Sequence, residues 1–254
     1  MKIEKEKLVF PNIKGENLSA LLERPEGNLK AYALFAHCFT CSKNIGTATR
    51  VSRALAERGF ATLRFDFTGL GNSEGDFSNT NFSSNVDDLV SASSYLSSVY
   101  EAPKVLVGHS LGGAAVIAAA ARLPGAKAVV TIAAPSDPAH MRHLLRDSVP
   151  EIMQKGWAMV EIGGQEFRIK KQFLDDVSEQ NLEKFLKNLD RPLLIMHSLR
   201  DELINIKHAY HLFDVARGSK SFITLESADH LLSNPEDATY TAETIAAWAS
   251  RYVK

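Results

Sequence analysis

The chain has 254 residues, of which 45% are hydrophobic and 23% charged, a composition typical of a globular protein with a sizeable core. Its 29 basic and 30 acidic residues are interspersed and leave a formal net charge of -1. This balance favours neither a nucleic acid nor an anionic membrane as a partner. The longest strongly apolar run, 114–121, is too short to cross a bilayer, and residues 1–7 lack the apolar stretch of a signal peptide. We therefore expect a cytoplasmic protein that acts on small molecules.

The chain opens with two strand-like segments, 3–10 and 18–24, which are joined by a turn-prone stretch and predict an antiparallel hairpin at the edge of a sheet. Apolar strands and helices with 3.6-residue spacing then alternate. The predicted strands span residues 31–36, 60–65, 105–108, 128–133, 193–197 and 221–225, and the predicted helices span residues 44–58, 82–99, 111–123, 206–215 and 234–252. This alternation predicts an α/β fold, a mainly parallel twisted sheet with helices on both faces, whose ligands bind at the carboxyl ends of the strands.

Residues 136–190 are much longer than the roughly 2 to 6 residues that usually flank a crossover helix, and so they indicate an insertion. Their pattern predicts a short helix, then a hairpin around Gly163 and Gly164, then a helix over residues 173–189. We divide the chain into a core of residues 1–135 and 191–254 and a cap of residues 136–190 over the ligand-binding edge. A peripheral subdomain is the alternative.

The central motif is an apolar strand that ends in Gly-x-Ser-x-Gly, from Gly108 to Gly112, and is followed at once by a helix. This is the pattern of a nucleophile elbow, in which a strained turn exposes the serine hydroxyl. Ser110 would be the nucleophile, and the N–H of Leu111 would point to a developing oxyanion. A glycine-punctuated turn with a solvated serine is the alternative, and the matching strand and helix favour the elbow.

A serine nucleophile needs a histidine base and a carboxylate that orients it. Asp201 follows the predicted strand 193–197, and His230 follows the predicted strand 221–225, so both would lie at the same edge as Ser110 in the order serine, acid, histidine. Asp137 is the rival acid, because it also follows a strand.

The remaining histidines indicate structural roles. His37 and His109 end strands and are expected to brace neighbouring loops. Two helical pairs with i, i+3 spacing, His140 with His143 and His208 with His211, lack a nearby third metal ligand and are expected to be solvated. We therefore predict no metal site.

The glycine-rich stretch 69–75 resembles a dinucleotide loop only superficially. Its last glycine comes one position late and no helix begins there, so no helix N-terminus is available for a pyrophosphate. We expect an extended loop and no nucleotide cofactor.

The motif 108–113 together with Asp201 and His230 resembles the α/β-hydrolase superfamily in the same order along nearly the whole chain. Residues 37–43 (His-Cys-Phe-Thr-Cys-Ser-Lys) and 66–75 (Asp-Phe-Thr-Gly-Leu-Gly-Asn-Ser-Glu-Gly) are similar to the hydrolase half of bacterial proteins that join an α/β hydrolase to an OsmC-like domain. We expect no such second domain here.

The resemblance implies that the loop after strand 31–36 supplies a second oxyanion donor, by position the N–H of Phe39. Cys38 stands where glycine is usual in the superfamily and Thr68 where arginine is common. These departures leave the substrate open.

The resemblance implies a serine esterase or thioesterase that acts through an acyl-enzyme on Ser110 and needs no cofactor. An aminopeptidase-like hydrolase and a non-catalytic ligand-binding protein are the alternatives. The expected partner is a small-molecule acyl substrate, and a homodimer is retained as one option for the assembly. Large apolar side chains of the cap are candidates for substrate binding: Met141, Leu144, Leu145, Trp157 and Phe173.

The only two cysteines, Cys38 and Cys41, flank the predicted donor Phe39. If the loop forms a turn, their Cα atoms come within about 7 Å, which a disulfide can bridge. Closing the bond would then be expected to displace the Phe39 N–H and make activity sensitive to oxidation. Two inert, buried thiols are the alternative.

Overall fold

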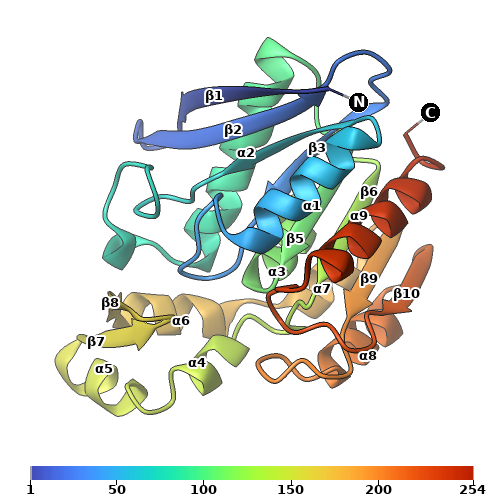
Figure 1. Ribbon diagram of the computed structural model, residues 1–254. Helices are drawn as coiled ribbons and strands as arrows, with labels where there is room; N and C mark the ends of the chain where they lie inside the picture. The colour runs from blue at the N-terminus through green and yellow to red at the C-terminus, as the bar shows by residue number, and fades with distance from the viewer. Residues whose placement is uncertain (1, 254) are drawn as a thin grey trace.

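The computed structural model describes residues 2–253 and contains one sheet of eight strands in the order β1-β2-β4-β3-β5-β6-β9-β10 (Figure 1). The strands are β1 (Ile3–Pro11), β2 (Asn17–Pro25), β3 (Ala31–Ala36), β4 (Phe60–Phe65), β5 (Val105–His109), β6 (Ala128–Ile132), β9 (Leu193–His197) and β10 (Lys220–Thr224). The β1–β2 and β2–β4 pairs are antiparallel, and the other neighbours are parallel. The predicted edge hairpin and the mainly parallel sheet are both confirmed.

Helices cover both faces of the sheet. On one face α1 (Gly46–Glu57) and α9 (Pro235–Ala249) pack against each other and share an apolar cluster with the strands. On the other face lie α2 (Phe82–Val99), α3 (Leu111–Ala120) and α8 (Lys207–Val215). Helix α2 begins at the predicted cap, Asn81, whose side chain accepts from the Ser84 N–H while the Ser84 hydroxyl donates back to the Asn81 carbonyl. Among residues 2–253, no helix combines the length and the apolar character needed to cross a membrane.

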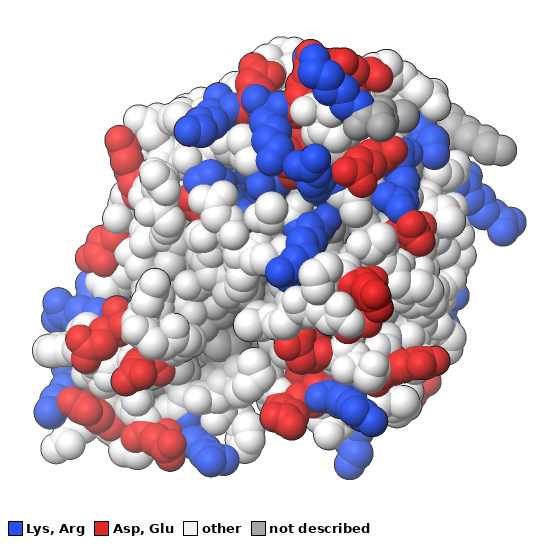
Figure 2. Space-filling model, in the orientation of Figure 1, with Lys and Arg blue, Asp and Glu red and all other residues white. Residues whose placement is uncertain are grey.

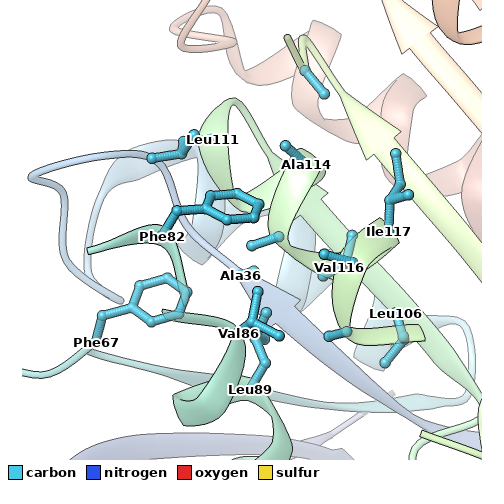
Figure 3. Packing of buried hydrophobic residues seen from close by; sticks show 14 of the residues in the cluster. Ala36, Phe67, Phe82, Val86, Leu89, Leu106, Leu111, Ala114, Val116 and Ile117 are labelled. Atoms are coloured by element: carbon cyan, nitrogen blue, oxygen red, sulfur yellow. The ribbon is translucent and has the colours of Figure 1, made fainter. Parts of the chain in front are cut away.

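Helix α3, which begins at the nucleophile motif, is buried on all sides. Its small side chains let it lie close to the sheet, and α2 closes over it. Figure 3 shows the Phe82 ring of α2 pointing at α3 below Leu111. A helix that is apolar all round belongs in a core, so the turn before α3 is fixed on both sides by packing.

The segment 136–190 forms α4 (His140–Leu144), α5 (Val149–Lys155), the hairpin β7 (Trp157–Ile162) and β8 (Gln165–Lys170), α6 (Lys171–Glu179) and α7 (Leu182–Lys187). Helix α5 was not predicted. The single helix predicted for 173–189 is wrong, because Gln180 has an extended backbone and the Asn181 side chain begins α7 by accepting the Lys184 N–H. Helix α7 packs against α3 and α8. The division into core and cap stays a prediction.

Candidate active site

Ser110 lies at the sharp turn between β5 and α3, with φ +56° and ψ -127°. A non-glycine residue with positive φ is strained, and the close approach of strand and helix enforces this conformation. A Cβ at Gly108 would collide with the Gly112 carbonyl, and a Cβ at Gly112 would collide with the His37 carbonyl. The Ser110 N–H is held by the Ile132 carbonyl of β6 at 2.9 Å. The elbow geometry predicted from the motif is therefore present.

A chain of hydrogen bonds joins the three predicted catalytic side chains. The Ser110 Oγ lies 3.1 Å from His230 Nε2, and His230 Nδ1 lies 2.8 Å from Asp201 Oδ2. Because a carboxylate only accepts, Nδ1 carries the proton and Nε2 is free to accept from the serine. The three residues come from the loops or turns after β5, β9 and β10, so the parallel strands deliver them to one edge.

The Asp201 carboxylate is held in place by two backbone N–H groups in addition to His230. Its Oδ1 accepts the N–H groups of Leu203 and Ile204 at 2.9 and 2.8 Å. Burial raises the pKa of this carboxyl, but the hydrogen bond and charge of His230 together with the Ile204 N–H outweigh it, so the pKa is lowered overall. The rival acid, Asp137, instead accepts the Ala139 N–H at 2.9 Å before α4. The structure thus brings Asp201 to His230.

The two predicted oxyanion donors face a common pocket. Within residues 2–253, neither the Phe39 N–H nor the Leu111 N–H donates to another protein group. Both residues line a small pocket of about 10 Å³ that lies next to Ser110 in the chain but is not lined by its side chain or by His230. Its other walls are His37, Cys38, Thr40, Phe67, Leu70, Phe77, Asn85, Gly112 and Ala115. The wall from Phe67 to Phe77 was missed from the sequence. Its signal was its position directly after β4, at the edge where ligands bind.

The predicted cap residues lie in different surroundings. Phe173 of α6 is buried and stacks on the Phe39 ring at 5.0 Å between centroids, and Met141 and Leu145 are buried in the same apolar cluster. Leu144 and Trp157 are exposed by 42% and 37%. The Trp157 ring is covered by the Arg168 guanidinium, which lies 4.1 Å from the ring centroid. Figure 2 shows a hollow in the surface between α1 and α4 that is formed by uncharged side chains.

The other histidines brace the site as expected. His37 Nδ1–H donates to the Cys38 carbonyl at 2.8 Å, and His109 Nε2–H donates to the His230 carbonyl at 2.7 Å. Burial is the main cause that lowers the pKa of His37 to about 4 and that of His109 to about 3, so both rings are neutral donors at pH 7.

The expectation of solvated helical histidines is wrong for His208. Its ring is half-buried, lies 4.6 Å from the His140 ring and accepts the Ser136 N–H through Nδ1 at 3.2 Å. In the part of the chain that the structure describes, no group of three or more ligating side chains could hold a metal ion.

Cys38 and Cys41 form a disulfide, and their Cα atoms are 5.4 Å apart. The expected turn is confirmed by a hydrogen bond from the Cys41 N–H to the Cys38 carbonyl. The alternative of two free thiols does not hold in this structure.

A family model described as "Alpha/beta hydrolase family" matches residues 33–251. The chain is 27% identical over 197 residues to the mouse "Palmitoyl-protein thioesterase ABHD10, mitochondrial", with 75% of this chain and 65% of the mouse protein aligned. The aligned part thus spans slightly less than two thirds of that relative.

Solved structures extend the likeness over the full length. An esterase domain from a Rhodothermus marinus protein is 48% identical, with a TM-score of 0.80 and complete coverage of both chains. "Alpha/beta hydrolase domain-containing protein 10 from mouse" is 23% identical with a TM-score of 0.80, covering 97% of this chain and 99% of that one. These structures confirm the architecture predicted from the sequence.

Proposed function

The chain belongs to the alpha/beta hydrolase family, and from this premise we propose that it is a serine hydrolase of carboxylic esters or thioesters with small to medium acyl groups. The observation that carries the proposal is the chain of hydrogen bonds from Ser110 through His230 to Asp201, set at a strained elbow. The N–H groups of Phe39 and Leu111, which have no acceptor within residues 2–253, add to it. Such an arrangement activates a hydroxyl and stabilises the anion that forms when the hydroxyl attacks a carbonyl.

In the first half of the proposed reaction, His230 Nε2 takes the Ser110 proton as Oγ attacks the acyl carbonyl. The positive charge that develops on the imidazole is stabilised by Asp201, which is ionised because its pKa is lowered. The Phe39 and Leu111 N–H groups donate to the oxyanion. His230 then protonates the leaving alcohol or thiol, and the acyl group remains on Ser110.

In the second half, His230 removes a proton from water, which attacks the acyl-enzyme carbonyl. The same two N–H groups stabilise the second oxyanion, and Ser110 leaves with the proton from His230. These protein groups account for every proton transfer in both halves.

The pocket beside the donors supports the substrate class. Its walls are mostly apolar, and its volume of about 10 Å³ holds no long acyl chain without a movement of the walls. The names of two relatives, an esterase domain and a palmitoyl-protein thioesterase, agree with ester and thioester chemistry. We propose that α4 to α6 act as a cap and that Phe173, stacked on Phe39, forms its contact with the acyl side.

The proposal is tested with p-nitrophenyl esters and matched acyl thioesters of two to sixteen carbons, and with aminoacyl p-nitroanilides. We expect turnover of esters and thioesters that is greatest for short acyl chains and absent in Ser110→Ala. Turnover confined to the anilides would replace the esterase assignment with a peptidase. Binding of acyl ligands without any turnover would replace it with a ligand-binding role.

A further inference from the structure

The oxyanion loop, residues 38–41, is a four-residue turn with a strained centre. The Cys41 N–H reaches the Cys38 carbonyl at 3.3 Å, near the long limit for a hydrogen bond, and Thr40 has φ +58°. For a β-branched residue this left-handed conformation is an outlier, because Cβ crowds the backbone. Something other than the preference of Thr40 therefore keeps the turn in this shape.

Hydrogen bonds fix the backbone at both ends of the turn, whereas the Phe39 N–H inside it has no acceptor within residues 2–253. The Cys38 carbonyl accepts from His37 Nδ1–H at 2.8 Å, and downstream the Lys43 N–H donates to Asp66 Oδ1 at 2.6 Å. Between these anchors lie the long turn hydrogen bond and one from the Thr40 hydroxyl to the Phe39 carbonyl at 2.7 Å. One covalent link, the Cys38–Cys41 disulfide, spans the whole turn. The disulfide closes the ring that contains Phe39, whose N–H has no acceptor within the described chain.

We propose that the Cys38–Cys41 disulfide is a site of thiol–disulfide exchange and that it positions the Phe39 N–H, so that reduction by a dithiol lowers hydrolase activity. This inference rests on the proposed function, in which Phe39 is an oxyanion donor. It reverses the direction expected from the sequence, because the bonded form is the one that presents a free N–H at the pocket.

The exchange balances as a two-electron transfer from a dithiol. A thiolate of the reductant attacks the Sγ of Cys41, which is partly exposed, while Cys38, only 5% exposed, leaves as the thiolate and takes up a proton. The second thiol of the reductant then displaces Cys41 and closes the reductant's own disulfide. The protein gains two thiols, and the dithiol is oxidised.

Without the disulfide, Thr40 can return to a negative φ. This change rotates the peptide planes on either side of Thr40. The free-energy penalty of the left-handed conformation then lowers the population of the active turn conformation, relative to the relaxed one, by about 5- to 30-fold. Because an oxyanion donor acts on the transition state, kcat should fall by that factor while KM changes little.

The test compares ester hydrolysis by three proteins, each fully oxidised and then treated with dithiothreitol. Wild type should lose about 5- to 30-fold in kcat and recover on reoxidation. The double variant Cys38→Ser, Cys41→Ser should show the lower kcat in both conditions. Thr40→Gly, in which the left-handed conformation carries no Cβ penalty, should lose no more than about twofold on reduction.

A second measurement keeps the inference independent of turnover. The backbone amide NMR signal of Phe39 should shift on reduction of wild type, because the peptide plane rotates, with the signals of β5 unchanged as evidence that the fold persists. Equal kcat in oxidised and reduced wild type, or an equal loss in Thr40→Gly, would overturn the inference. If oxidised wild type lacked turnover altogether, the proposed function would fail. An unchanged Phe39 amide signal on reduction would overturn the disulfide's positioning role separately.

Discussion

The residue before the proposed nucleophile holds the residue proposed as its base: His109 Nε2–H donates to the His230 backbone carbonyl at 2.7 Å. His109 is fully buried at the end of β5, and its ring lies 5.0 Å from the His230 ring. The loop that carries His230 lies between Glu226 and Leu232, which both have positive φ. The bond thus joins a strained loop directly to the elbow, and we propose that His109 positions His230.

Replacement of His109 tests this tie. His109→Leu removes the donor, so we expect the His230 ring to shift and kcat to fall about 10- to 100-fold with little change in KM. His109→Gln retains an N–H near the Nε2 position and should recover most of that loss. Steady-state kinetics of both variants, with circular dichroism to verify folding, decide the matter. Equal losses in the two variants would reduce His109 to a packing role.

The two candidate acids, Asp201 and Asp137, are distinguished by the loss of kcat when each is replaced by asparagine. Asp201→Asn replaces the acceptor of the His230 Nδ1 proton and favours the wrong tautomer, so we expect kcat to fall by roughly 10³- to 10⁴-fold. Asp137→Asn alters only a contact to the Ala139 N–H and should leave kcat within about twofold. Activity of the two variants on one ester is the measurement. The reverse ranking would move the acid to the loop after β6.

The stack of Phe173 on Phe39 predicts a role in acyl selection. Phe173→Ala, and to a smaller degree Met141→Ala and Leu145→Ala, should shift preference toward longer acyl chains, by about 1–3 kcal/mol per methylene of changed contact. Trp157→Ala is the matched control, because its ring lies under Arg168 and should not affect the profile. The measurement is kcat/KM across an ester series, and coincident profiles for all four variants would reject a cap-lined pocket.

Asp88 on α2 predicts a change of stability with pH. Its carboxylate accepts the Thr68 N–H and hydroxyl at 2.9 and 3.0 Å, yet burial raises its pKa to about 6. The folded protein therefore binds this proton more tightly than the unfolded chain does. As pH rises from about 4 to 6 the group ionises, and the free energy of unfolding falls by about 3 kcal/mol from this cause.

Urea unfolding at pH 4.5 and 7 measures this effect by difference. Asp88→Asn lacks the titrating group and should not lose stability from this cause. The free energy of unfolding of wild type should therefore fall relative to that of Asp88→Asn as pH rises from 4.5 to 7. The neighbour Asp87 pairs with Arg122 at the surface, so Asp87→Asn should follow the wild-type dependence. Parallel curves for wild type and Asp88→Asn would show that the buried carboxyl does not link folding to protons.

Much of the fold could be predicted because its signals are local. The bounds of β3, β4 and α2 match the prediction. Continuous apolar runs define the two strands and the Asn81 cap defines the start of the helix, and each of these signals involves only neighbouring residues. Helix α5 was missed because only Ile152 of its seven residues is buried, and the break at Gln180 was missed because helical spacing continues across it.

The candidate site likewise has parts that local sequence predicts and parts that it does not. The elbow and the order of Ser110, Asp201 and His230 follow from a motif and from positions after strands. The stack of Phe39 on Phe173 joins segments far apart in the chain, and Phe77, which begins a 3-10 helix of three residues, packs on Phe39 from a third segment. Such pairings depend on tertiary packing, which neither periodicity nor a motif describes.

Labelling with a fluorophosphonate probe tests the central claim most directly, because the probe reacts covalently only with an activated nucleophile. Mass spectrometry of a digest should locate one adduct, on the peptide with Ser110. Ser110→Ala should remain unlabelled, and His230→Ala should label far more slowly. An unlabelled wild-type protein, or an adduct on another residue, would contradict the account.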